Sequence, residues 1–283
     1  MTHIWHSTNT MMKFKSVLYK ELIELNLYII TLCQFKCPYC YSRYENLSKW
    51  NKIMDLDLIH KIVEGIKYSK GNFSISLLGG EPTLHPHFYE IISSFTKIKN
   101  IKEVIIYTNG VKPIDIIDDK VRVVFAFHPS ENNVNLKKNI LSCKCNKKIS
   151  LSLVKKFQNE IKDMYNFAVN NSIEIEPTFI TNPKNKHFLI PKIIQYENHK
   201  VYDYNGTKYN LLEVYDNNLD NFKGWKCYIN SYEIDVDGEC RRECSSKKYD
   251  INNMFKDMKY DYTVCKCDKC VEQCLLDYTK IKD

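Results

Sequence analysis

The sequence of 283 residues predicts an α/β fold built on parallel strands. Short apolar segments alternate with amphipathic segments of helical spacing through the first two thirds of the chain. Several apolar segments end on Gly or Asn, as strands do where they enter a loop. The last quarter lacks long apolar segments and holds seven of the twelve cysteines. We therefore expect an α/β core followed by a small, loop-rich module that binds metal.

Six strand–helix units account for the core. The expected strands are 25–32, 73–78, 104–108, 121–127, 149–154 and 173–180. The expected helices are 55–69, 88–97 and 157–169, with a short helix that begins at Pro113. In the helix over 55–69, apolar residues recur every three or four positions, which marks one buried face. Six units are fewer than the eight of a full barrel, so we predict a partial (βα)6 barrel of the TIM type.

The same segments predict the domain organisation. We expect an N-terminal extension over 1–24, the partial barrel over 25–183, a bridging segment over 184–224 and the cysteine module over 225–283. No apolar run is long enough to span a membrane, and the N-terminus lacks the pattern of a secretory signal. We therefore expect no membrane association and a cytoplasmic location, in which cysteines are reduced or metal-bound.

The positive charge is unevenly distributed. The chain has 41 Lys and Arg against 34 Asp and Glu, a formal net charge of +7. From Cys227 onward ten basic residues stand against twelve acidic ones, so the excess lies in the first part. A basic core is compatible with an anionic substrate or a nucleic acid. The alternative is a solvated, lysine-rich surface.

Three cysteines stand within eight residues directly after the first strand: Cys33, Cys37 and Cys40. Disulfides cannot satisfy three thiols, and a closed structural zinc site needs four ligands. In an iron–sulfur cluster each thiolate binds one iron, so three thiolates on four irons leave one iron free for another ligand. Such an open position is what a catalytic metal site requires. The end of a barrel strand is also where reactive groups gather.

Three motifs together resemble the radical S-adenosylmethionine (SAM) superfamily over about residues 22–182. The cysteines, with Tyr39 between them, resemble its CxxxCx(aromatic)C signature. Gly79-Gly80-Glu81-Pro82 resembles its GGEP motif and Thr108-Asn109-Gly110 its TNG motif. The resemblance implies a [4Fe–4S] cluster on Cys33, Cys37 and Cys40, whose open iron binds SAM, and an electron donor such as flavodoxin or ferredoxin. It implies SAM contacts for Tyr39, Gly79, Gly80, Glu81, Pro82, Thr108, Asn109, Ser130 and Lys155, with Glu81 suited to the ammonium group.

The tail cysteines resemble the SPASM/twitch extension of radical SAM enzymes, which binds one or two auxiliary [4Fe–4S] clusters. A structural zinc ribbon is the alternative. The expected ligands are Cys227, Cys240, Cys244, Cys265, Cys267, Cys270 and Cys274.

Three further residues are candidates for a catalytic role. His128 follows the fourth strand, where a substrate contact or an acid/base role is possible. Cys143 and Cys145 follow in a polar connection, either as a hydrogen donor or third metal site, or as idle thiols.

The resemblance implies an enzyme that cleaves SAM to a 5'-deoxyadenosyl radical and abstracts a hydrogen atom from a substrate. Relatives with such tails often mature peptides, so we expect a peptide substrate that is cross-linked or epimerised. One alternative keeps this chemistry but acts on a nucleoside, a modified DNA base or another anionic small molecule, as the basic core suggests. The alternative from another class is a non-catalytic iron–sulfur or zinc scaffold.

Overall fold

The structure is a computed structural model, and the chain divides into two compact units. One comprises residues 22–194 and 231–259, and the other comprises residues 1–21, 195–230 and 260–283. The structure describes residues 12–16, 22–40, 51–179, 202–204, 207–209, 213–214, 217–242, 248–258, 261–266 and 279–282.

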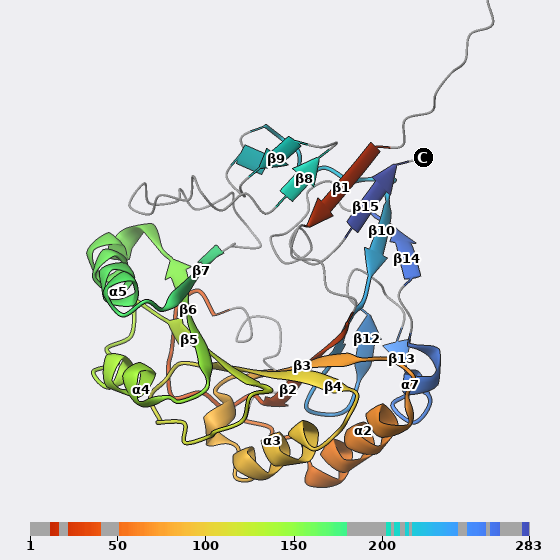
Figure 1. The fold of residues 1–283 in the computed structure, drawn as a ribbon, viewed down its shortest axis with the longest axis horizontal. Helices are drawn as coiled ribbons and strands as arrows, with labels where there is room; N and C mark the ends of the chain where they lie inside the picture. Colours follow the sequence, from red (N-terminus) through yellow and green to blue (C-terminus); the bar gives the residue numbers. More distant parts are fainter. Residues whose placement is uncertain are drawn as a thin grey trace, which may run out of the picture. The chain divides into compact units, whose positions relative to one another are not determined.

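The larger unit is built on a nine-stranded sheet in the order β13-β12-β11-β2-β3-β4-β5-β6-β7 (Figure 1). All neighbours from β11 to β7 are parallel, whereas β12 and β13 pair antiparallel. The strands are β2 Ile23–Ile30, β3 Phe73–Gly79, β4 Ile101–Thr108, β5 Val121–Phe127, β6 Asn146–Leu153, β7 Glu174–Phe179, β11 Ser231–Ile234, β12 Cys240–Arg242 and β13 Lys248–Tyr249.

Helices run along the outer side of this curved sheet (Figure 1). They are α2 Leu56–Tyr68, α3 Phe88–Thr96, α4 Leu136–Ser142, α5 Gln158–Asn170 and the short α7 Met254–Asp257, with 3-10 turns η2 Pro82–Leu84 and η3 Lys155–Phe157. Parallel strands that follow one another in space and carry helices on the outside confirm the predicted α/β fold of a partial barrel.

Local sequence explains why the elements form where they do. In α2, Ile59, Ile62, Val63 and Ile66 are buried at helical spacing, and the Asp55 side chain caps the helix by accepting a hydrogen bond from the Asp57 N–H. The inner strands are almost continuously apolar, as strands covered on both faces must be.

The structure differs from the prediction at two connections. No helix begins at Pro113; residues 113–118 are irregular and lead into a turn at 119–120, where the Asp118 carboxylate accepts the Lys120 N–H at 2.9 Å. Conversely, α4 forms in the polar connection after β5, where no helix was predicted, because Leu136, Asn139 and Ile140 share one buried face.

The tail also contributes to the main sheet. β11 pairs parallel with β2 and lies within the predicted cysteine module. The Asn26 amide donates a hydrogen bond to Ser231 Oγ at 3.1 Å, and both residues are buried.

The smaller unit is an antiparallel sheet in the order β14-β10-β15-β1-β8-β9. Its strands are β1 Met12–Ser16, β8 Tyr202–Tyr204, β9 Thr207–Tyr209, β10 Lys226–Ile229, β14 Asp261–Val264 and β15 Thr279–Lys282. Phe222, Trp225 and Ile229 are buried in this unit. Across both units, no helix that the structure describes has the length and apolar character to cross a membrane.

Candidate functional site

The three sequence motifs meet at one edge of the main sheet. The loop 31–40, which carries Cys33, Cys37 and Cys40, leaves β2, and we call it the cysteine loop. Residues 79–82 end β3, residues 108–110 end β4, and His128 follows β5. These four strands are consecutive neighbours and parallel, so their carboxyl ends lie at the same edge. This is the edge where α/β barrels place their reactive groups.

The glycine pair lets β3 touch the start of the cysteine loop. The Gly80 N–H donates to Ile30 O and the Glu81 N–H donates to Leu32 O, each at 2.8 Å. A Cβ atom at Gly79 would lie 2.0 Å from Ile30 O, and one at Gly80 would lie 2.2 Å from Leu32 O. Only glycine therefore permits this approach of two backbones.

The Glu81 carboxylate ties the end of β3 to the end of β4. Its Oε1 accepts the Thr83 N–H at 3.1 Å and the hydroxyls of Thr83 and Thr108 at 2.6 and 2.7 Å. Its Oε2 accepts the Asn109 N–H at 2.7 Å. The side chain is buried, and these four bonds satisfy the buried charge. The predicted contact of Glu81 with the ammonium group of SAM is not among them and stays a prediction.

The sulfur of Cys33 receives two N–H donors. The Phe35 N–H lies 3.4 Å from Cys33 Sγ, and the Asn109 side-chain amide lies 3.8 Å from it. Burial raises the pKa of Cys33, and burial followed by the Glu131 carboxylate raises the pKa of Cys37 to about 12. Without a positive metal these thiols hold their protons at neutral pH.

The donor set fits an iron–sulfur cluster. Thiolates are the ligands of such clusters, and N–H groups directed at a ligand sulfur are typical of their surroundings. Three cysteines of one loop, one of them already accepting two N–H bonds, supply both features. In the part of the chain that the structure describes, no three His, Cys, Asp or Glu side chains converge on a point that a single ion could fill.

His128 lies between two aromatic rings of the cysteine loop. The ring centroids of Phe35 and Tyr39 each lie 6.2 Å from that of His128, and Ser130 Oγ donates to the Tyr39 hydroxyl at 3.2 Å. Burial lowers the pKa of His128 to about 4, so its ring is neutral at pH 7. Its Nδ1 is buried and has no hydrogen-bond partner among the described residues. The structure thus places His128, Tyr39 and Ser130 at the predicted edge.

Cys143 and Cys145 lie away from the cysteine loop, and their catalytic role stays a prediction. Cys143 caps the C-terminus of α4, and Cys145 directly precedes β6. Both are buried, and Cys145 Sγ donates to Ile116 O at 3.2 Å. The amino end of a parallel strand is the opposite edge of the sheet from the cysteine loop. Lys155 follows β6 within η3, at the predicted edge, but its side chain lies outside the described part.

Only three of the tail cysteines are described. In the smaller unit, Cys227 lies in β10 and Cys265 directly follows β14. Cys227 pairs with Thr263, two positions before Cys265, so the two cysteines share one face of this strand pair. Cys240 lies in β12 of the larger unit, where burial raises its pKa to about 12. Cys244, Cys267, Cys270 and Cys274 lie outside the described residues.

Four residues of the site were not predicted: Gln34, Phe35, Asn133 and Asn139. The Asn133 amide donates to Asn109 O at 2.7 Å, and the Asn139 amide donates to Gly110 O and Val111 O at 2.9 and 3.1 Å. Both asparagines stand in a polar segment, so nothing in the local sequence marks them.

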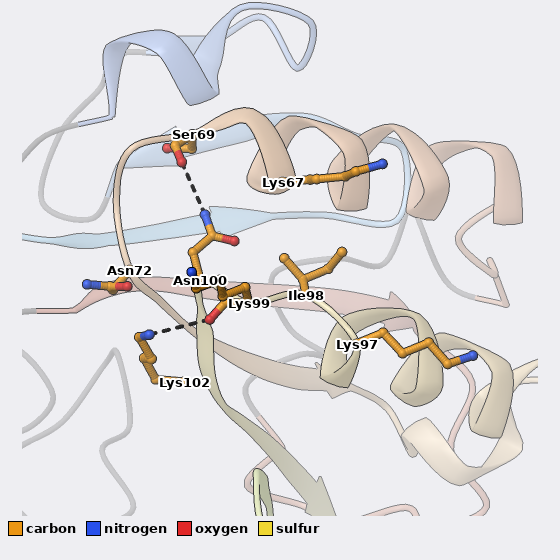
Figure 2. A pocket seen from close by; sticks show the side chains of 8 residues that line it. All are labelled: Lys67, Ser69, Asn72, Lys97, Ile98, Lys99, Asn100 and Lys102. Atoms are coloured by element: carbon orange, nitrogen blue, oxygen red, sulfur yellow. Dashed lines mark hydrogen bonds between the residues drawn. The ribbon is translucent and has the colours of Figure 1, made fainter.

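A surface pocket of about 420 Å³ lies at the opposite edge of the sheet. Figure 2 shows the residues that line it: Lys67, Ser69, Asn72, Lys97, Ile98, Lys99, Asn100 and Lys102. The Asn100 amide donates to three carbonyls, of Ile66, Ser69 and Gly71. The four lysines are exposed, as in a solvated basic surface.

Together the fold and this edge define an α/β barrel protein with three cysteines in one loop at the carboxyl edge of its parallel strands. Comparison with known families is more specific: residues 27–130 match the model of the Radical SAM superfamily. The three motifs, His128 and Ser130 all fall within the residues that match this model.

Two similar sequences share one name, GTP 3',8-cyclase. GTP 3',8-cyclase of Mannheimia succiniciproducens is 36% identical over 92 residues, 32% of this chain and 27% of that protein. GTP 3',8-cyclase of Clostridium perfringens is 31% identical over 104 residues, 36% of this chain and 31% of that protein. The chain thus spans less than a third of the length of these relatives. With the domain match, they support an enzyme.

Similar structures extend over most of the chain. The structure of anSMEcpe with bound AdoMet and the Cp18Cys peptide has a TM-score of 0.56 and 16% identity, and it covers 84% of this chain and 79% of its own. Streptococcus suis SuiB bound to precursor peptide SuiA has a TM-score of 0.53 and 17% identity, over 85% of this chain and 62% of its own. At these identities the likeness shows the fold.

Proposed function

We propose that this protein is a radical SAM enzyme whose cluster is held by Cys33, Cys37 and Cys40. The observation that carries the proposal is the convergence of the cysteine loop, the 79–82 strand end and the 108–110 strand end at one edge. When bound, the cluster supplies the electron that splits SAM into methionine and a 5'-deoxyadenosyl radical, which takes a hydrogen atom from the substrate.

The chain's own residues position and shield this chemistry. Gly79 and Gly80 hold the β3 end against the cysteine loop, so backbone groups can approach SAM. Glu81 fixes the neighbouring β4 end. Phe35, Tyr39 and His128 form an aromatic group beside the cysteines that excludes water.

A direct test measures 5'-deoxyadenosine by liquid chromatography after anaerobic reconstitution with iron and sulfide, reduction with dithionite and addition of SAM. We expect formation by the wild type and loss in the variant Cys33→Ala/Cys37→Ala/Cys40→Ala. The matched control, Cys143→Ala/Cys145→Ala, removes two cysteines at the other edge and retains cleavage. Cleavage by the triple variant would reject the assignment, and absence of cleavage by the wild type would support the scaffold alternative.

Two substrate classes are candidates. A peptide is the primary one, and the similar structures with bound peptides extend over 84% and 85% of this chain. A nucleotide is the second, favoured by the names of the sequence relatives and by the basic character of the core.

The salt dependence of binding separates the two classes. Binding of GTP is measured by fluorescence at two salt concentrations, because salt screens the attraction between the phosphates and basic side chains. Saturable, strongly salt-dependent binding of GTP favours a nucleotide. Absence of GTP binding leaves the peptide class, which is then tested by mass spectrometry of peptides incubated with the active enzyme.

The tail cysteines complete the proposal. Cys227 and Cys265 share one face of the β10–β14 pair, which suits two ligands of one auxiliary [4Fe–4S] cluster. Cys240, Cys244, Cys267, Cys270 and Cys274 are the further proposed ligands.

A further inference from the structure

The side chain of Asn109 links the end of β4 to a proposed cluster ligand. Its Nδ2 lies 3.8 Å from Cys33 Sγ. We propose that Asn109 is a positioning residue that donates an N–H hydrogen bond to the Cys33 sulfur and thereby raises the reduction potential of the cluster. This inference rests on the proposed function, because it requires a cluster on Cys33.

The hydrogen bonds of Oδ1 fix the orientation of the Asn109 side-chain amide. Asn109 Oδ1 accepts the Val111 N–H at 3.1 Å and the Gln34 side-chain amide at 3.2 Å. An atom that accepts two N–H donors is the oxygen, so the end that faces Cys33 is the NH2 group. The contact with the sulfur is therefore a donated hydrogen bond.

The backbone of Asn109 is held on both sides. Its N–H donates to Glu81 Oε2 and its carbonyl accepts from the Asn133 amide, both at 2.7 Å. The residue is 4% exposed. Its side chain therefore has little room to turn away from Cys33, and low exposure strengthens the hydrogen bond electrostatically.

The chemical consequence follows from charge. Reduction by one electron makes the cluster and its sulfurs more negative. A hydrogen-bond donor stabilises the more negative form more strongly, so it raises the potential. The second donor to Cys33 is the backbone N–H of Phe35, which a side-chain substitution leaves in place. Substitution of Asn109 therefore isolates one of the two donors.

The test is a redox titration of the reconstituted protein followed by electron paramagnetic resonance (EPR). Asn109→Leu keeps the branching and the number of side-chain heavy atoms but has no side-chain N–H. We expect its equilibrium constant for one-electron reduction to fall about tenfold, which corresponds to about 59 mV. The control Asn132→Leu makes the same change at an exposed asparagine and keeps the donor to the Cys33 sulfur, so its potential should stay at the wild-type value.

An unchanged potential in Asn109→Leu with full iron content would overturn the inference. A second measurement does not depend on the folding of that variant: wild type labelled with 15N at its asparagine side-chain amides is examined by pulsed EPR. We expect a weak 15N coupling to the reduced cluster, and its absence would also overturn the inference. If the wild type cleaves SAM, either negative result rejects only the role of Asn109; if it binds no cluster, the proposed function itself fails.

Discussion

At the residue scale, Glu81 shows what a buried carboxylate does at this edge. Its two oxygens accept four hydrogen bonds, from Thr83, Thr108 and Asn109. A charge with so little exposure is stable only because every bond is made. The residue therefore organises the strand ends around the cysteine loop, in addition to the SAM contact predicted for it.

Glu81→Gln tests this organising role. The glutamine oxygen can still accept from the threonines, but its NH2 group then faces the Asn109 N–H, so two donors oppose each other. We expect the free energy of unfolding to fall by about 1–3 kcal/mol in urea denaturation. The control Glu90→Gln changes an exposed carboxylate that pairs with His87, and it should stay within about 0.5 kcal/mol of the wild type. Equal stability of the two variants would contradict the role.

His128 makes stability depend on pH. Its pKa is lowered from 6.5 to about 4 by burial, so between these values the unfolded chain binds more protons than the folded chain. Stability is therefore fully present above pH 6.5 and falls as the pH drops toward 4. We expect His128→Phe to reduce the loss of unfolding free energy between pH 7 and pH 5 by about 2 kcal/mol, measured by urea denaturation at both pH values.

The control for this prediction is His60→Phe, which changes an exposed residue of α2 and should leave the pH dependence at the wild-type value. If His128→Phe also retains the full pH dependence, then acid destabilisation arises at other groups.

The sequence patterns predicted the residues that meet at the site, but not the residues that hold them in place. Cys33, Glu81 and Asn109 could be placed together because each follows a strand of one parallel sheet. Asn133 and Asn139 could not, because their roles depend on which carbonyls a folded loop presents to them. A polar residue in a polar segment carries no local signal for such a long-range bond.

At the element scale, α4 supports the end of β4. Asn139 is buried on the inner face of α4, and its amide donates to Gly110 O and Val111 O. A helix after β5 thus holds the backbone that follows Asn109. The predicted helix at Pro113 is absent, and this connection instead depends on turns and on α4.

Asn139→Ala tests this support. The change leaves two carbonyls without their donor, so we expect a loss of about 1–3 kcal/mol of unfolding free energy in thermal or urea denaturation. Lys138→Ala, at the exposed neighbouring position, is the matched control and should change stability by no more than about 0.5 kcal/mol. A loss in Asn139→Ala no larger than in the control would show that α4 does not support the loop in this way.

Strand positions were the most predictable elements. The predicted strand 121–127 coincides with β5, because all of its residues except Arg122 are apolar, as is typical of buried parallel strands. The pairing of β11 with β2 was not predictable, since Ser231–Ile234 and Ile23–Ile30 are about two hundred residues apart and their partner choice is a long-range property.

At the scale of the whole molecule, the described cysteines lie in both compact units. The cysteine loop belongs to the larger unit, which contains the residues that match the Radical SAM model, and Cys227 and Cys265 belong to the smaller unit. We propose that the first holds the cluster that acts on SAM and that the tail cysteines hold auxiliary metal. These two proposals can be tested separately, by iron content and by SAM cleavage.

Cys227→Ala/Cys265→Ala is expected to lose about four iron atoms per chain relative to the reconstituted wild type, the content of one [4Fe–4S] cluster. The variant should still form 5'-deoxyadenosine from SAM in the absence of substrate, because the cysteine loop is intact. Iron and sulfide assays measure the first effect and liquid chromatography the second. Cys143→Ala/Cys145→Ala, which removes two buried cysteines that lie away from both proposed cluster sites, should lose no iron. An iron content of Cys227→Ala/Cys265→Ala equal to that of the wild type would rule out an auxiliary iron–sulfur cluster on these residues. Zinc bound to the wild type in place of this iron would rule it out as well and would favour the zinc ribbon.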